Sequence, residues 1–136
     1  MTLTVKQVPL HFVAQTWPVV EPFLRLAEQY GTDYNIDQIK VFVSMGQWML
    51  LVVVDDAGEV HGGFTVSFLN YPNDRVAFIT CIGGRLIANK DTFAQMKEIL
   101  KVSGATKIQG AAREAVARLW RRLGFNEKYI VVETKI

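Results

Sequence analysis

The chain has 136 residues, a length typical of one domain, and we expect a single domain over residues 1–136. Half of the residues are hydrophobic and 21% are charged, so the chain can bury a core and is not a disordered tail. Its formal net charge is +2, and its basic and acidic residues are interleaved. This charge pattern argues against a nucleic-acid-binding protein.

Cysteine usage and the apolar runs bear on the compartment of the protein. Cys81 is the only cysteine of the sequence, so an internal disulfide is excluded and an oxidising compartment is not indicated. The first residues contain no long apolar segment of the kind found in secretory signals. The longest apolar run, Trp48 to Val54, is far too short to span a membrane. We therefore expect a cytoplasmic protein with no membrane partner.

The first part of the chain predicts a strand and a helix. Residues 2–8 alternate well enough for a short strand. Residues 11–30 have a helical composition but contain Pro18 and Pro22, each of which lacks a backbone donor. We expect a short turn there, followed by a main helix that begins near one of the two prolines, because proline fits the first turn of a helix.

A second helix and three strands should follow. Asn35, with Gln38 three residues later, predicts a capping box at the start of the helix. Residues 48–54, 59–69 and 75–82 then predict a meander of three strands. The alternation predicts two sets of residues that share a face: Val60, Gly62, Phe64, Val66 and Phe68 on the second strand, and Val76, Phe78, Thr80 and Ile82 on the third.

The last part of the chain predicts two more helices, each followed by a strand. One helix should run from about Asn89 or Asp91 to Ser103, with a short strand over residues 106–110 after it. A final strand of high β-propensity is expected over residues 129–136. Between these strands lies a helix whose predicted buried face, at helical spacing, consists of Val116, Leu119, Trp120 and Leu123.

This last helix carries a resemblance to a known family. It reads Trp120-Arg-Arg-Leu123-Gly124-Phe125 and is similar to the last conserved helix of the GNAT superfamily of acyl-CoA-dependent N-acyltransferases, which ends in Tyr-x-x-Leu-Gly-Phe. The predicted order of elements is also that of the family, so the resemblance spans nearly the whole chain. It implies a mixed α/β (α+β) fold with a mostly antiparallel sheet of about six strands, flanked by about four helices. The layout also resembles GNAT-like proteins encoded by tailed phages.

The resemblance implies a site for acetyl-CoA. In the family, pantetheine lies between the third meander strand and the strand after the next helix, and pyrophosphate lies on the N-terminus of that helix. Alanine and lysine stand here where family members have glycines, so the site would be degenerate and its affinity weaker. An ordinary strand-to-helix loop is the alternative interpretation. The corresponding residues are Ile82, Gly83, Gly84, Arg85, Ala88, Asn89 and Lys90.

No catalytic acid or base follows from the sequence. Trp120 replaces a tyrosine that protonates the leaving thiolate in many family members, and an indole N–H is not a usable acid. Water or another group, such as Tyr129, would then deliver the proton. The third meander strand carries no carboxylate, and the nearest candidates for a base by sequence are Glu59, His61 and Asp74.

Other reactive groups indicate no further site. His11 and His61 have no partner at metal-ligand spacing, so we expect no metal. Cys81 lies on a predicted buried strand without the signature of a nucleophile, which favours a small core residue.

Two functions remain open. The resemblance implies an N-acetyltransferase that moves acetyl from acetyl-CoA to a primary amine of a small molecule or a protein. The alternative is a catalytically inactive binding or assembly protein, phage-encoded and virion-associated, found in the host cytoplasm or the virion. Family members usually have one further terminal strand, and its absence would leave an exposed edge. A homodimer through the C-terminal edge strand would cover that edge.

Overall fold

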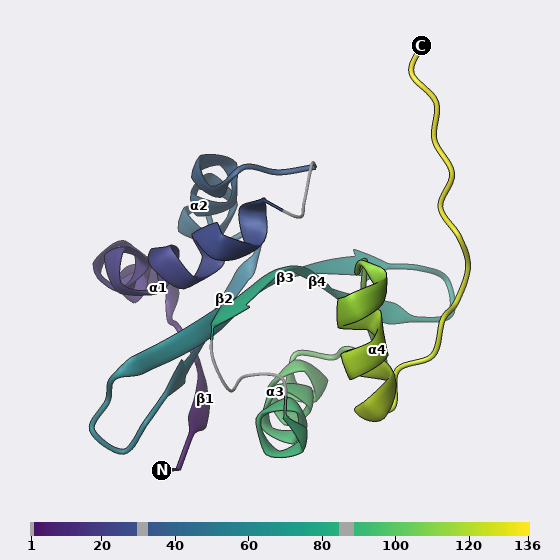
Figure 1. The fold of residues 1–136 in the computed structure, drawn as a ribbon. Coiled ribbons are helices and arrows are strands. Elements are labelled where there is room, and N and C mark those ends of the chain that lie inside the picture. Colours follow the sequence, from purple (N-terminus) through teal and green to yellow (C-terminus); the bar gives the residue numbers. More distant parts are fainter. Residues whose placement is uncertain (1, 30–32, 85–88) are drawn as a thin grey trace.

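The computed structural model describes residues 2–29, 33–84 and 89–136, and its described strands form one mixed sheet (Figure 1). The sheet has the order β1-β2-β3-β4-β5. All neighbouring pairs are antiparallel except β4 and β5, which are parallel. The strands are β1 (Thr4–Gln7), β2 (Met49–Val54), β3 (Val60–Asn70), β4 (Arg75–Gly84) and β5 (Lys107–Gly110).

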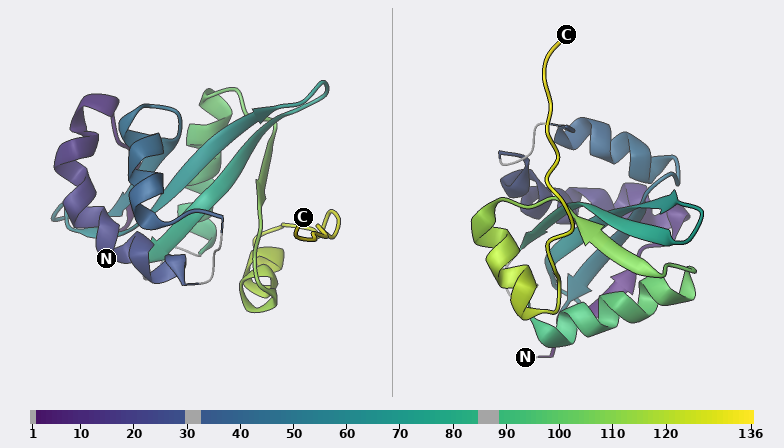
Figure 2. Two further views of the ribbon diagram at one scale, coloured as in Figure 1. Left: turned by 90° about the horizontal axis from the view of Figure 1, so that it is seen from above. Right: turned by 90° about the vertical axis from the view of Figure 1, so that its right-hand side faces the viewer.

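Helices cover both faces of this sheet (Figures 1 and 2). They are the short 3-10 helix η1 (Leu10–Phe12), α1 (Val13–Glu28), α2 (Ile36–Ser44), α3 (Lys90–Val102) and α4 (Glu114–Arg122). The α1/α2 core contains Trp17, Val20, Leu24, Ile39, Val43, Leu50, Val52 and Cys81. The α3/α4 core contains Leu51, Val53, Phe64, Val66, Ala77, Ile79, Met96, Leu100 and Trp120. The predicted single fold of mixed α and β elements is confirmed.

Helix α1 differs from the prediction because it runs through both prolines. Pro18 and Pro22 lie inside the helix, one turn apart, on its exposed side. A proline leaves the carbonyl four residues earlier without a donor, here those of Ala14 and Pro18. Both residues are exposed, so water can bind these carbonyls. The buried face of the helix therefore continues past both prolines.

Other local predictions are confirmed. Asn35 accepts a hydrogen bond from the backbone N–H of Gln38 and the side chain of Gln38 returns one, which completes the predicted capping box. Helix α3 begins after Asn89, as predicted. In α4 the buried face is narrower than predicted, because Trp120 is buried but Leu119 remains 45% exposed.

Two β-bulges change the predicted faces of the central strands. His61 is an extra residue between the pairs Val54–Val60 and Val53–Gly62. It puts Val60 against the α1/α2 core, whereas Phe64, Val66 and Phe68 pack against the other core. A bulge shifts every residue beyond it to the other face of the strand.

The second bulge lies in β4. Thr80 is the extra residue between the pairs Thr65–Cys81 and Val66–Ile79. Its hydroxyl lies 2.8 Å from that of Thr65, and it also donates to the carbonyl of Thr65 at 3.0 Å. Because of the bulge, Ile82 shares a face with Ile79 and not with Val76 and Phe78 as predicted.

A pair of glycines allows α1 to pack close to the sheet. Gly63 of β3 pairs with Gly83 of β4. A Cβ atom at Gly63 would lie 2.6 Å from a methyl carbon of Val20, and one at Gly83 would meet the backbone carbonyl of Phe23. The backbone of α1 therefore occupies the space in which two side chains would stand.

The predicted sixth strand is not formed. Residues 129–136 are extended but lie in no described strand, and the segment leads away from the fold (Figure 1). High β-propensity describes how a residue fits a neighbouring strand, and this segment has no strand beside it. The sheet of the described residues thus has five strands and not about six.

No helix in the described parts of the chain is both long and apolar enough to cross a membrane.

The glycine pair generates a prediction for stability. We expect Gly83→Ala to lower the free energy of unfolding by about 3 kcal/mol or more, because the added methyl meets a helix backbone that cannot rotate away. Gly58→Ala is the control, since Gly58 has a positive φ of 82° but open space around it. The control should cost about 1 kcal/mol. Urea unfolding of both variants checks this, and a smaller loss for Gly83→Ala than for Gly58→Ala would refute it.

Candidate functional site

The candidate site lies where β4 and β5 part. The parallel pairing runs from Val76–Lys107 to Ile79–Gly110. Beyond it, β4 continues to Gly84, whereas the chain after Gly110 turns toward α4. The described part of β4 past Ile79 therefore has no strand partner on this side. This divergence near residue 82 is the one that the family resemblance predicts.

Side chains fill the recess between the diverging strands. Its volume is about 10 Å³, which is room for about one water molecule. The ring centroid of Phe125 lies 5.1 Å from that of Phe93 and 5.3 Å from that of Trp120. The described residues that line the recess are Phe64, Ile79, Ile82, Phe93, Met96, Trp120, Leu123 and Phe125. All of them are apolar, and none titrates.

Trp120 closes the recess from the side of α4. Its side chain is buried, with 7% of its surface exposed. A Cβ atom at Gly110 would lie 2.5 Å from Cζ3 of this indole, so the ring occupies the space of the missing side chain. The glycine at the end of β5 is thus explained by the tryptophan, which confirms Trp120 as a core residue.

The N-terminus of α3 is the polar end of the site. The side chain of Asn89 caps the helix by accepting a 2.8 Å hydrogen bond from the backbone N–H of Thr92. Lys90 and Asp91 are exposed in the first turn, one of each charge. The hydroxyl of Thr92 is buried and has no hydrogen-bond partner within the described structure. Such a group costs free energy unless a ligand or an ordered water binds it.

The predicted acetyl-CoA residues fall into three groups. Ile82 lines the recess, and Asn89 and Lys90 begin α3. Gly83 and Gly84 end β4, but packing already accounts for both. Gly83 faces α1, and a Cβ atom at Gly84 would meet Gly62 and the carbonyl of His61. Arg85 and Ala88 lie outside the described residues.

The predicted acid and base candidates lie away from the recess lining. Tyr129 is 66% exposed in the C-terminal segment. Asp74 precedes β4 at its opposite end, 3.1 Å from the ammonium group of Lys107, and this hydrogen bond lowers the pKa of the carboxyl group. His61 and Glu59 belong to the hairpin between β2 and β3. None of these residues lines the recess.

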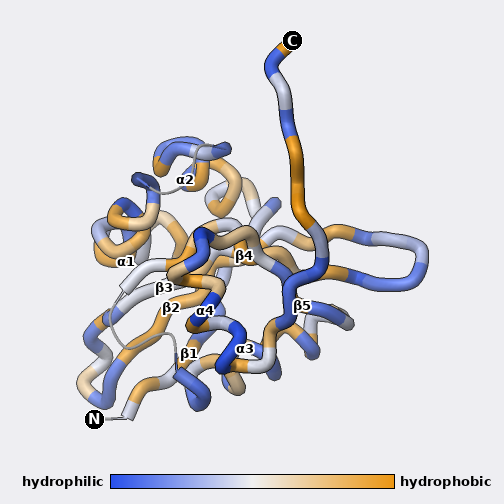
Figure 3. Tube along the Cα trace, turned by 45° about the vertical axis from the view of Figure 1, so that its right-hand side comes forward, coloured by the Kyte–Doolittle hydropathy of each residue, from blue (hydrophilic) through white to orange (hydrophobic). Residues whose placement is uncertain are grey.

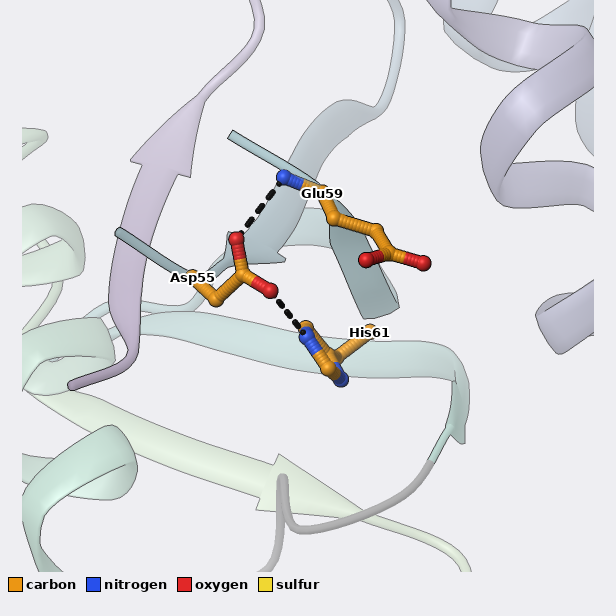
Figure 4. A group of neighbouring side chains, drawn as sticks. All are labelled: Asp55, Glu59 and His61. Carbon is orange, nitrogen blue, oxygen red and sulfur yellow. Dashed lines mark hydrogen bonds and ion pairs between the residues drawn. The ribbon is translucent and has the colours of Figure 1, made fainter. Parts of the chain in front are cut away.

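That hairpin contains a cluster that sequence spacing did not reveal (Figure 4). Asp55, Glu59 and His61 bring their possible ligand atoms within 4.8 Å of one another, because the turn and the His61 bulge fold the chain back on itself. The carboxylate of Asp55 already accepts hydrogen bonds from the backbone N–H groups of Ala57 and Glu59. It also lies 2.9 Å from Nε2 of His61. These bonds explain the cluster as a brace for the turn.

Cys81 is a core residue, as predicted. Its thiol is buried and lies 3.7 Å from the backbone carbonyl of Leu24. Burial raises the pKa of this thiol to about 11, so it remains protonated near neutral pH. A protonated thiol is a poor nucleophile.

The brace in the hairpin generates a prediction about pH. Hydrogen bonds, first from His61 and then from Glu59, lower the pKa of Asp55 below its ordinary value of 3.8. The carboxylate therefore stabilises the fold above that value, and the contribution is lost as the pH falls through the lower, folded-state pKa. We expect Asp55→Asn to be less stable than wild type at about pH 6, and the difference to shrink toward about pH 2.

Urea unfolding across this range measures the effect. Glu59→Gln is the matched control in the same turn, because Figure 4 shows its carboxylate pointing away from Asp55. The control should keep the wild-type dependence on pH. A constant difference between Asp55→Asn and wild type across the range would contradict the assignment.

Comparison with known proteins identifies the fold. Neither a scan against models of protein families nor a search of curated protein sequences found a match to this chain. Solved structures do match. An aminoglycoside acetyltransferase from an uncultured soil metagenomic sample aligns over 100% of this chain and 99% of its own, with a TM-score of 0.71 and 19% identity.

Two further structures support the same fold. The aminoglycoside 6'-N-acetyltransferase AAC(6')-Ih of Acinetobacter baumannii gives a TM-score of 0.66 at 17% identity, over 99% of this chain and 98% of that one. A putative acetyl transferase of Pyrococcus furiosus gives 0.69 at 13% identity, over 99% and 100%. At these identities the likeness concerns the fold. The chain has the fold of the GNAT-type acetyltransferases, as its sequence predicts.

Proposed function

We propose that this protein binds acetyl-CoA and transfers the acetyl group to a primary amine. The observation that carries the proposal is the divergence of β4 and β5 past Ile79, directly before α3, within a fold shared with acetyltransferases. This divergence exposes the edge of β4, and the amide groups of a pantetheine arm can pair with such an edge.

The N-terminus of α3 supports the phosphate end of the site. Backbone N–H groups and the helix dipole favour an anion there. Lys90 adds a positive charge in the first turn, and Asn89 begins the helix. The buried hydroxyl of Thr92 lacks a partner within the described structure, and a phosphate oxygen or an ordered water would supply one. Arg85, outside the described residues, would add a second cation.

The recess sets a limit on affinity. At about 10 Å³ it does not hold a pantetheine arm as it stands. Phe125 follows Gly124, whose φ is 100°, and it is half-buried at the start of the C-terminal segment. A rotation of this side chain would open the recess without moving a helix. The free energy of that rearrangement would be subtracted from the binding energy, so we infer a weaker affinity than for a preformed site.

The chemistry would rest on position more than on acid–base catalysis. The amine nitrogen bonds to the thioester carbonyl carbon, the carbon–sulfur bond breaks, and the proton of the amine leaves to water. The edge N–H groups of β4 would polarise the carbonyl. The recess lining offers no acid or base, and general acid–base catalysis typically contributes about 10²–10⁴ in rate. We therefore infer a slow enzyme.

The acceptor would be a small molecule or a protein with a primary amine. Two of the matched structures are aminoglycoside acetyltransferases, which makes an aminoglycoside a reasonable first acceptor to assay.

Calorimetry with acetyl-CoA tests the binding site. We expect wild type to bind, and Lys90→Ala to bind about fivefold to tenfold more weakly, because one charge-assisted contact to phosphate is lost. Lys40→Ala on α2 is the control, since Lys40 is an equally classed exposed lysine far from α3 in sequence. Absence of binding to wild type would refute the proposal, as would an equal loss for both variants.

A second candidate is a binding or assembly protein that has lost catalysis, phage-encoded and virion-associated. The filled recess and its purely apolar lining favour it.

Substitution of Trp120 separates the two candidates. If the protein is an enzyme slowed by the lack of an acid, Trp120→Tyr should raise the acetylation rate by about tenfold or more, since a phenol can protonate the thiolate. Trp120→Phe is the control, because it removes the same bulk without adding an acid. Acetylation of an amine panel, followed by mass spectrometry, gives the rates. If none of the three proteins transfers acetyl, the inactive alternative holds.

A further inference from the structure

One edge of the sheet is open. Among the described strands, β5 pairs with β4 on one side and with nothing on the other. Its backbone N–H and C=O groups on the open side can therefore pair with another strand, and natural proteins usually cover or interrupt such an edge.

The C-terminal segment is an apolar strand without a sheet. Its side chains at Tyr129, Ile130, Val131 and Val132 are 66%, 88%, 80% and 87% exposed. These residues favour β-structure, and they form the apolar stretch that Figure 3 shows clear of the fold. Apolar residues occupy both faces of this stretch, as in strands that are covered on both sides.

A groove lies beside the open edge. Its volume is about 910 Å³, and it runs between β5, α3 and the residues that follow α4. Its apolar part includes Leu100, Ile108 and Phe125, and its basic part includes Lys97, Lys101 and Lys107. An extended chain paired with β5 would place alternate side chains into this groove.

We propose that the C-terminal segment of one copy of this chain pairs with the β5 edge of a second copy, and that the exchange is reciprocal. The segment 129–136 is longer than β5, which has four residues, so it can cover the whole edge. In the structure it does not turn back onto its own edge but leads away from it (Figures 1 and 2). A two-fold dimer would bury both apolar segments and both open edges at once.

This inference does not rest on the acetyl-CoA proposal, but it reaches the same site. Phe93, Leu123 and Phe125 line both the groove and the recess. A partner strand in the groove would therefore pack against the side chains that fill the recess. The strand would restrict the rotation of Phe125.

Sedimentation equilibrium of the full chain tests the exchange. We expect wild type to have the mass of two chains, and the double variant Ile130→Asp/Val132→Asp to have the mass of one, because carboxylates cannot be buried beside β5. Val102→Asp is the matched control, since Val102 is also 88% exposed but lies at the end of α3. The control should remain a dimer. A monomeric wild type overturns the proposal, as does a dimeric double variant.

Disulfide trapping shows which chain covers the edge. Gln109→Cys lies on β5 and Val131→Cys on the C-terminal segment. The two single variants, mixed and oxidised, should give a product that contains one chain of each. Cys81 is buried and should not interfere. If the mixture gives no such product, and a chain that carries both cysteines closes an internal disulfide, each segment covers its own edge and the exchange is refuted.

Discussion

The indole of Trp120 lies in the space that a side chain at position 110 would occupy, and this contact couples the end of β5 to the recess. A Cβ atom there would lie 2.5 Å from the ring, so the strand must end in glycine for α4 to pack. The last pair between the parallel strands is Ile79–Gly110, and beyond it the chain leaves the sheet for α4. The place where the strands part is thus set by the packing of one ring on one glycine.

The same ring also forms one wall of the recess, with Phe125 against it at a centroid distance of 5.3 Å. A side chain that is needed to close the core cannot also leave an open slot for a ligand. The apolar end of the site is therefore well packed, whereas its polar end retains an unsatisfied hydroxyl at Thr92. This difference is what a ligand would exploit: it would have to displace aromatic contacts at one end, while it gained hydrogen bonds at the other. The balance between these two terms decides between an enzyme and an inactive module.

Sequence reasoning succeeded where the signal is local. The capping box at Asn35 and the cap at Asn89 depend on residues within one turn, and both are confirmed. It failed where the outcome depends on distant partners. The prolines of α1 are tolerated because they face solvent, and the strand expected at residues 129–136 is absent because no neighbour pairs with it. The site was predicted by resemblance to a family, but its closure was not, since side-chain packing across three elements has no local signature.

The two bulges show why strand periodicity is least reliable at the site itself. Without the extra residue at Thr80, strict alternation would place Ile82 on the same face as Val76 and Phe78. The bulge turns Ile82 toward α3 instead, where it lines the recess. In the neighbouring strand, the bulge at His61 brings its ring to the carboxylate of Asp55, six residues earlier. Both bulges are fixed by hydrogen bonds to residues on other strands or turns. An alternating pattern of apolar residues cannot reveal such bonds, so the faces of strands that carry a binding site must be read from the structure.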